Sequence, residues 1–229
     1  MASSPRRSAR PRTPHEVATL PPCPEVVAAA TGRGITQVVH FTTVKGVTGV
    51  LAKSAVKSRK RLPEEDYLEH VYQPNAEFRK DVAWLDYVNL SITRINDWMF
   101  DSSVRWHAHE DNPWVVLVLD VGLLGDPGVV FVTTNNIYPA CRRREGLGGF
   151  EELFASTVQG RYGSVHDRKG KQPDWPTDRQ AEVLYPGEVS CDYLRRIDVQ
   201  CPDVVDRIHG ILGGLGLSVP VRHAPEVFE

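Results

Sequence analysis

The chain has 229 residues, of which 41% are hydrophobic and 24% charged, and its formal net charge is -2. This composition is typical of a soluble globular protein with one well-formed core, with room for a tail. A net charge so close to zero excludes a global attraction to nucleic acid or membrane, so any such binding has to come from local patches.

The cysteines and the apolar runs indicate the compartment. Four cysteines are scattered without paired spacing, which favours a reduced cytoplasmic protein over a disulfide framework. The longest apolar run, residues 114–124, contains Asp120 and is too short to span a bilayer. We therefore expect a cytoplasmic protein without a membrane partner.

The first 34 residues differ in character from the rest. They begin with a basic stretch, and prolines interrupt the only candidate for the apolar core of a signal peptide. Residues 1–34 are predicted to form a flexible basic tail, and residues 35–229 a single domain.

The domain is predicted to begin with a strand and a helix. Residues 35–42, ITQVVHFT, are rich in β-branched side chains and predict a strand. Residues 43–56 predict a short amphipathic helix. Its apolar positions recur at helical spacing, at Val44, Val47, Val50 and Leu51.

Short strands dominate the remainder. They are predicted over residues 84–94, 112–124, 128–134, 181–186, 193–200 and 217–223. A helix with Asp203 as its N-cap is predicted to stop at Gly213–Gly214. Residues 135–178 are less regular, with a short helix over 148–158 and then a long polar loop, a length that is usually functional or disordered. Without a regular βαβ rhythm, the fold class is α+β.

Three motifs with catalytic potential are weak. The stretch WHAHED contains His107, His109, Glu110 and Asp111, but no further ligand cluster accompanies it, so we expect no metal site. None of the cysteines has the context of a nucleophile. The glycine-rich EGLGGF, residues 145–150, lacks the lysine of a phosphate-binding loop and is more typical of a turn.

Basic residues gather in two places. One run extends from Lys53 to Arg61, and a second is interleaved with aromatic side chains in the long loop region. Cations neutralise phosphates while aromatic rings stack on bases, so the second group suits single-stranded nucleic acid, although such runs are often only a solvated face. The candidates for nucleic-acid binding are Arg142, Arg143, Arg144, Arg161, Lys169 and Trp175.

The stretch TDRQAEVLYP places polar groups inside an apolar strand. Side chains alternate faces along a strand, so Gln180 and Glu182 share one side with Leu184. Such a face is either a half-solvated sheet surface or a rigid platform that holds a carboxylate beside a substrate.

Three short motifs together resemble the DarT family of DNA ADP-ribosyltransferase toxins: HFT at residues 40–42, a strand that ends in Arg94, and RQAE at residues 179–182. The run VSCDYLRRIDVQ is also similar to that family. The resemblance extends from about Ile35 to the end of the chain. It implies an ADP-ribosyltransferase-like split mixed β-sheet, mainly antiparallel, with an NAD cleft and a few peripheral helices.

The resemblance also implies roles for individual residues. Glu182 would bind the ribose next to nicotinamide and stabilise the positive charge that develops as nicotinamide leaves. His40 would bind a ribose hydroxyl, Thr42 would lie near the nicotinamide amide, and Gln180 would influence the acceptor. Arg94 would contact the NAD phosphates and polarise the attacked base. An arginine side chain stays protonated and is therefore a poor general base.

The implied activity is the transfer of ADP-ribose from NAD to a base of single-stranded DNA, by the toxin of a toxin–antitoxin or phage-defence pair. Thymine and guanine are both open as the base. The implied partner is an antitoxin glycohydrolase, of macrodomain type or another. Transfer to RNA or protein, and a catalytically inactive nucleic-acid-binding module, are the alternatives, and a metal-dependent nuclease is a distant fourth.

Overall fold

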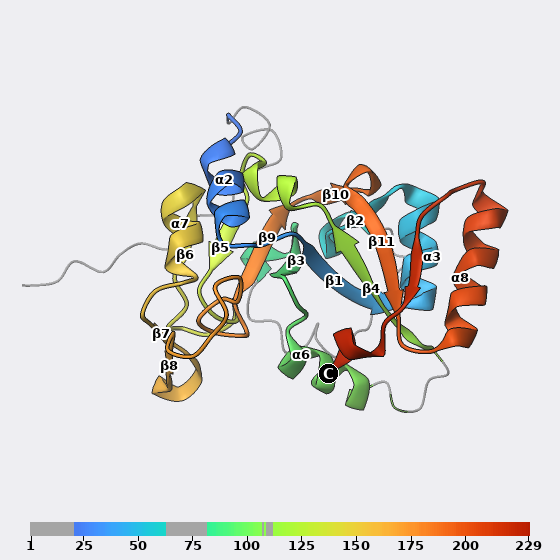
Figure 1. The fold of residues 1–229 in the computed structure, drawn as a ribbon. Helices are drawn as coiled ribbons and strands as arrows, with labels where there is room; N and C mark the ends of the chain where they lie inside the picture. Colours follow the sequence, from blue (N-terminus) through green and yellow to red (C-terminus); the bar gives the residue numbers. More distant parts are fainter. Residues whose placement is uncertain (1–20, 63–81, 107, 109–111) are drawn as a thin grey trace, which may run out of the picture.

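The computed structural model describes residues 21–62, 82–106, 108 and 112–229 (Figure 1). Five α-helices lie within these residues: α2 (Pro24–Gly32), α3 (Val44–Lys53), α6 (Asp97–Trp106), α7 (Gly146–Glu152) and α8 (Pro202–Leu215). The described strands are β1 (Val38–Thr43), β2 (Ala55–Lys57), β3 (Tyr87–Ile92), β4 (Trp114–Leu119), β5 (Val130–Val132), β6 (Arg143–Glu145), β7 (Thr157–Gln159), β8 (Val165–Asp167), β9 (Glu182–Pro186), β10 (Glu188–Ser190), β11 (Leu194–Val199) and β12 (Val221–His223). Short 3-10 turns complete the described part: Arg59–Arg61, Val82–Trp84, Val121–Gly125, Arg161–Gly163, Cys191–Tyr193 and Pro225–Phe228.

The main sheet has eight strands among the described residues, in the order β12-β11-β4-β1-β3-β9-β5-β6. Its neighbouring strands are antiparallel except β11 and β12, which are parallel. Two small sheets, β10-β2 and β7-β8, accompany it. The predicted α+β class with a mainly antiparallel mixed sheet is confirmed.

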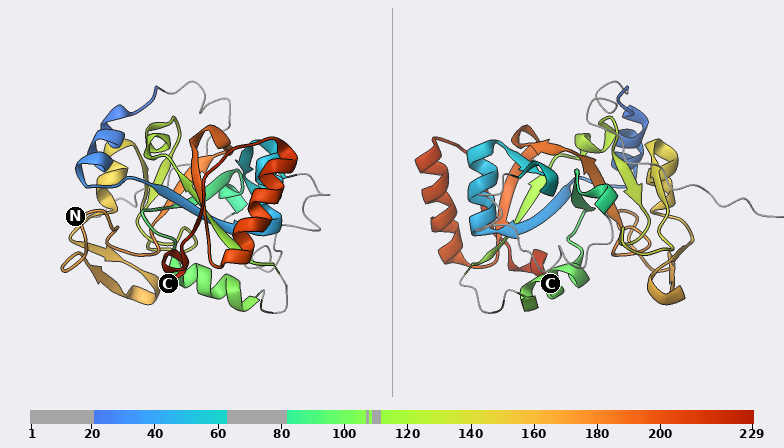
Figure 2. Two further views of the ribbon diagram at one scale, coloured as in Figure 1. Left: turned by 45° about the vertical axis from the view of Figure 1, so that its right-hand side comes forward. Right: turned by 180° about the vertical axis from the view of Figure 1, so that it is seen from behind.

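Helices cover the two ends of the sheet separately. Helices α3 and α8 pack beside β1, β4 and β11, whereas α2 and α7 lie together beside β5 and β6 (Figures 1 and 2). Helix α6 and the C-terminus meet below the sheet, where Phe100 and Phe228 pack on Val39 and Val116. Two structural halves therefore meet in the middle, around β1, β3 and β9.

The sheet divides between β1 and β3. These strands are in register only at Val38 with Ile92 and Val39 with Ser91, whereas β1 pairs with β4 along all six of its residues. Beyond Val39 the edge of β1 is no longer paired with β3. The split that the family resemblance implied is therefore present, and it opens next to His40.

Local sequence explains the turn from β1 into α3. Thr43 caps the helix, because its side-chain oxygen accepts a hydrogen bond from the Gly46 N–H at 3.2 Å. Val44, Val47 and Leu51 then face the core, as the helical spacing predicted. A rigid cap thus fixes the end of β1, where His40 and Thr42 lie.

The boundary predicted at residue 34 is too late in the chain. Helix α2 belongs to the folded domain, because Val26 and Ala30 are fully buried. The Cys23 N–H donates to the carbonyl of Gly125 at 2.7 Å and so ties the start of this helix to the domain. The tail predicted for the first twenty residues lies outside the described residues.

Two other predictions need correction. The helix predicted over 148–158 ends at Glu152, and the segment predicted to be a loop contains most of the β7–β8 hairpin, which begins at Thr157 and extends from the end of the molecule that carries β5 and β6 (Figure 2). Helix α8 starts at Pro202 with Cys201 as its N-cap, so Asp203 lies in the first turn, and it ends at Leu215, followed by Gly216 as the C-cap with φ 67°. Proline is favoured at the first helical position and glycine at a left-handed C-terminal residue, and these preferences explain both ends.

Candidate active site

Glu182 is the first residue of β9, in the middle of the sheet. Ala181 and Val183 point into the main core, as strand alternation predicted, and Glu182 is on the opposite face with only 7% of its surface exposed. A carboxylate this deeply buried needs hydrogen-bond donors to remain charged.

Two donors from distant parts of the chain meet this carboxylate. The side-chain amide of Asn89 on β3 donates to Glu182 Oε2 at 3.1 Å. The backbone N–H of Asn136, in the loop between β5 and β6, donates to the same oxygen at 3.1 Å. Two donors on one oxygen fix the orientation of the carboxylate, which is the preorganisation that charge stabilisation requires.

His40 on β1 contacts Asn89 from the other side of the split. Its ring Nδ1 lies 2.9 Å from the main-chain oxygen of Asn89. A carbonyl only accepts, so Nδ1 carries the hydrogen and Nε2 is the acceptor of the neutral ring. Burial lowers the pKa of His40, which favours this neutral form. Asn89 therefore connects the imidazole of His40, whose Nε2 can accept a hydrogen bond from a hydroxyl, to the carboxylate of Glu182.

Thr42 lies against the first turn of α3. A Cβ atom at Gly46 would overlap Thr42 Oγ1, so the close approach requires glycine at that position. Thr42 is half-buried on the same strand as His40, two residues further on. The fold thus places His40 and Thr42 on one side of β1 next to the split.

Arg94 follows a residue in an unusual conformation. Thr93 has φ 64°, in the left-handed region that few side chains adopt. Three hydrogen bonds hold it: its N–H donates to the Gln37 carbonyl at 3.1 Å, its carbonyl accepts from the Gln37 amide at 2.8 Å, and its hydroxyl donates to the Asp174 carbonyl at 3.1 Å. The chain therefore leaves β3 sharply, and Arg94 is exposed.

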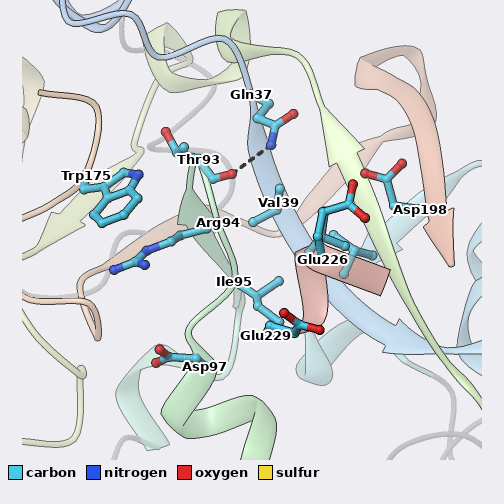
Figure 3. A pocket seen from close by; sticks show the side chains of 12 residues that line it. Gln37, Val39, Thr93, Arg94, Ile95, Asp97, Trp175, Asp198, Glu226 and Glu229 are labelled. Carbon is cyan, nitrogen blue, oxygen red and sulfur yellow. Dashed lines mark hydrogen bonds between the residues drawn. The ribbon is translucent and has the colours of Figure 1, made fainter. Parts of the chain in front are cut away.

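Arg94 and Trp175 form one wall of a pocket of about 260 Å³ (Figure 3). The guanidinium carbon of Arg94 lies 3.9 Å from the centre of the Trp175 ring, a cation–π contact. Figure 3 shows Asp198, Glu226 and Glu229 across the pocket from this pair. The structure therefore brings together one residue predicted to act in catalysis and one predicted to bind DNA.

Gln180 lies just before β9 and is buried, with 9% exposure. Its side-chain oxygen accepts a hydrogen bond from the Tyr138 hydroxyl at 2.9 Å. Burial raises the pKa of Tyr138, so the phenol stays a donor. The guanidinium of Arg161 lies 5.8 Å from the Tyr138 ring and 4.5 Å from that of Tyr162, whose side chain is 90% exposed. Arg161 and Tyr162 therefore form an exposed basic and aromatic surface next to the buried pair of Tyr138 and Gln180.

The other predicted DNA-binding residues do not form one patch. Arg142 and Arg144 are exposed and each lies 3.5 Å from Glu152 on α7. Lys169 is exposed near the β7–β8 hairpin. Arg143 instead contacts the Asn136 side chain and main chain.

Sequence reasoning missed Asn89, Asn136 and Tyr138. Each acts through a partner at least 42 residues away, and nothing in its local sequence marks it. The WHAHED residues His107, His109, Glu110 and Asp111 lie outside the described residues. Within the part that is described, no group of three or more histidine, cysteine or acidic side chains is arranged to hold a metal ion.

A split mixed sheet, with a histidine and a buried glutamate that both contact one asparagine beside the opening, agrees with the fold and the site that the family resemblance implied. Residues 39–229 match the family described as "DarT: ssDNA thymidine ADP-ribosyltransferase, DarT". The chain belongs to this family, and the predicted enzyme class is confirmed. Of the two bases left open by the sequence, the family description names thymidine.

Solved structures support the same fold. DarT of Thermus sp. 2.9 in complex with NAD+ has a TM-score of 0.59 at 16% identity, covering 85% of this chain and 98% of that one. The same protein in complex with ADP-ribosylated ssDNA has a TM-score of 0.62 at 15% identity, covering 86% and 97%. Thermosipho africanus DarTG in complex with ADP-ribose has a TM-score of 0.57 at 11% identity, covering 84% of this chain and 51% of that one. No curated protein sequence matches significantly.

Proposed function

We propose that this chain transfers ADP-ribose from NAD+ to thymidine in single-stranded DNA, with the split between β1 and β3 as the NAD+ site. The observation that carries the proposal is the buried carboxylate of Glu182, held by Asn89 and Asn136 next to His40. Membership of the family and the fold shared with an NAD+ complex support it.

In this proposal, β1 binds the nicotinamide end of NAD+. The neutral ring of His40 accepts a hydrogen bond from a ribose hydroxyl through Nε2, because Nδ1 is committed to Asn89. Thr42 lies near the nicotinamide amide, at the end of the same strand. These contacts bind the substrate and the transition state alike, so they act mainly on affinity.

Glu182 acts on the step that breaks the bond between nicotinamide and ribose. The electron pair of that bond leaves with nicotinamide, and positive charge develops on the ribose carbon and ring oxygen. The oriented carboxylate stabilises this charge and aligns a ribose hydroxyl. An electron pair of the thymine base then forms the new bond to the ribose carbon, and the base loses a proton.

Arg94, Gln180 and the basic surface serve the acceptor. Arg94, held against Trp175, contacts the NAD+ phosphates and polarises the base, and Gln180 contributes to the choice of acceptor. Along the DNA strand we propose phosphate contacts from arginine and lysine and base stacking on tryptophan. The residues in these roles are Arg142, Arg144, Arg161, Lys169 and Trp175.

We further propose that the chain is the toxin of a pair whose antitoxin removes ADP-ribose from DNA, and that it acts in the cytoplasm, where NAD+ and DNA are available. Within the described residues no helix is long and apolar enough to cross a membrane.

The test is Glu182→Gln, which keeps the shape and removes the charge. We expect loss of nicotinamide release with NAD+ affinity changed by less than about fivefold, because the charge acts mainly in the transition state. Arg207→Ala, on the exposed side of α8, is the control for an unrelated change of charge. Wild-type rates of transfer by Glu182→Gln would overturn the assignment.

A further inference from the structure

Three consecutive arginines, Arg142 to Arg144, have different surroundings. Arg142 and Arg144 are exposed and approach Glu152 on the outer helix α7. Arg143 is the first residue of β6 and its side chain is turned to the other side, as strand alternation requires. Its guanidinium carbon lies 5.6 Å from the centre of the buried Trp84 ring.

Arg143 donates two hydrogen bonds to Asn136, one to its side chain and one to its main chain. Its Nε donates to Asn136 Oδ1 at 2.5 Å, and its terminal nitrogen donates to the Asn136 carbonyl. The Cys141 thiol points at the same carbonyl, with a sulfur–oxygen distance of 3.5 Å. Burial raises the pKa of Cys141 to about 11, so the thiol keeps its proton and remains a donor.

The segment that contains Asn136 is otherwise a loop between β5 and β6. Its base is closed by Thr133 and Arg142, whose backbone groups bond at 3.1 Å. Near its tip, the Ile137 N–H donates to the Asn135 side chain at 3.1 Å. Asn136 is enclosed by the bond between Asn135 and Ile137, is 1% exposed, and donates its N–H to Glu182 Oε2.

A short path therefore leads from Arg143 through Asn136 to the carboxylate of Glu182. We propose that Arg143 is a positioning residue for Glu182 rather than a DNA contact. By donating hydrogen bonds to both oxygens of Asn136, Arg143 orients the backbone N–H of Asn136 toward Glu182. This inference rests on the proposed function, because it concerns the residue that stabilises the transition state.

Lysine would not replace arginine in this role. The planar guanidinium makes two bonds in fixed directions, and the single ammonium of a lysine cannot reproduce them. A phosphate contact, by contrast, tolerates lysine much better, since phosphate binding needs mainly the charge. The two roles thus predict different outcomes for Arg143→Lys.

The experiment compares Arg143→Ala and Arg143→Lys with Arg142→Ala and Arg144→Ala. A thymidine-containing oligonucleotide and NAD+ are the substrates. We expect both Arg143 variants to lower kcat about 10- to 100-fold, the effect of a small misplacement of a catalytic group. The KM for NAD+ and the Kd for DNA should stay within about threefold of wild type. Arg142→Ala and Arg144→Ala should instead raise the Kd for DNA, whereas Arg207→Ala on α8 is the control that should leave both kcat and the Kd unchanged.

A double-mutant cycle tests whether Arg143 acts through Asn136. Asn136→Ala removes the side-chain contact with Arg143 and keeps the main-chain one, so if Arg143 acts through Asn136 the double variant loses less than the product of the two single losses. Multiplicative losses, a wild-type kcat in Arg143→Lys, or a loss confined to DNA affinity would each overturn the inference. Thermal unfolding of each variant shows whether a loss of activity comes from a loss of the fold. If a variant is unfolded at the assay temperature, the kcat of Arg143→Lys, measured at a temperature where it is folded, tests the positioning role instead.

The same assay separates this inference from the proposed function. A wild-type protein that modifies no oligonucleotide overturns the proposed function, and nicotinamide release from NAD+ alone then becomes the readout for Arg143. Equal release by wild type and Arg143→Ala, or none by either, overturns the inference as well.

Discussion

Asn89 connects the two halves of the site, and its replacement by alanine is the most informative change. The side-chain amide donates to Glu182 Oε2 at 3.1 Å, whereas the contact to His40 uses the main chain. Asn89→Ala therefore removes the bond to Glu182 and keeps the bond to His40. A hydrogen bond to a charged group contributes about 1.5–3 kcal/mol. If most of it acts in the transition state, kcat should decrease about 10- to 100-fold.

The assay is steady-state nicotinamide release with varied NAD+, so that kcat and KM are separated. We expect the KM for NAD+ to change by less than about threefold, because His40 keeps its partner. Asn89→Asp is the matched variant of nearly equal size. It places a second carboxylate against Glu182 and should be more damaging than alanine at neutral pH. An unchanged kcat in Asn89→Ala, or a loss found only in KM, would refute the linking role of Asn89.

Three further predictions concern affinity, pH and stability. Gly46→Ala should weaken NAD+ binding in calorimetry, because its Cβ would displace Thr42, whereas Gly49→Ala on the same helix meets open space and should leave binding unchanged; equal affinities would contradict this. Since burial lowers the pKa of His40 below 6.5, the unfolded chain takes up this proton first. The contribution of neutral His40 to the free energy of unfolding is therefore fully present above pH 6.5 and is lost as the pH falls below this value. Denaturant titrations should show this pH dependence in the wild type and not in His40→Gln. Asp198 is fully buried and forms ion pairs with the partly exposed Arg196 and Arg222. Asp198→Asn should therefore lower the free energy of unfolding by about 2–4 kcal/mol in the same titrations, and a change near zero would argue against this ion-pair network.

The sequence was sufficient to predict the strand that carries Glu182. Strand alternation put Ala181 and Val183 on one face and Gln180 and Glu182 on the other, and the structure confirms that Ala181 and Val183 lie in the core. The helix after β1 was also predictable, because Val44, Val47 and Leu51 repeat at helical spacing and Thr43 is a good cap.

Other features depend on long-range register. Asn89 and Glu182 are 93 residues apart, and only the pairing of β3 with β9 brings them together. The same limit applies to the arginine run, because its charge pattern does not show that Arg143 alone turns toward Asn136. Helix α2 was missed because its proline-rich start resembles a linker, although Val26 and Ala30 are buried by the fold.

The measurement that tests the central claim most directly is the intact mass of short single-stranded oligonucleotides after incubation with the protein and NAD+. One oligonucleotide contains a single thymidine, and a matched one has this position replaced by cytidine. We predict the addition of one ADP-ribose to the first and none to the second, with loss of the product in Glu182→Gln. Modification of the thymidine-free oligonucleotide, or no modification of either, would contradict the account.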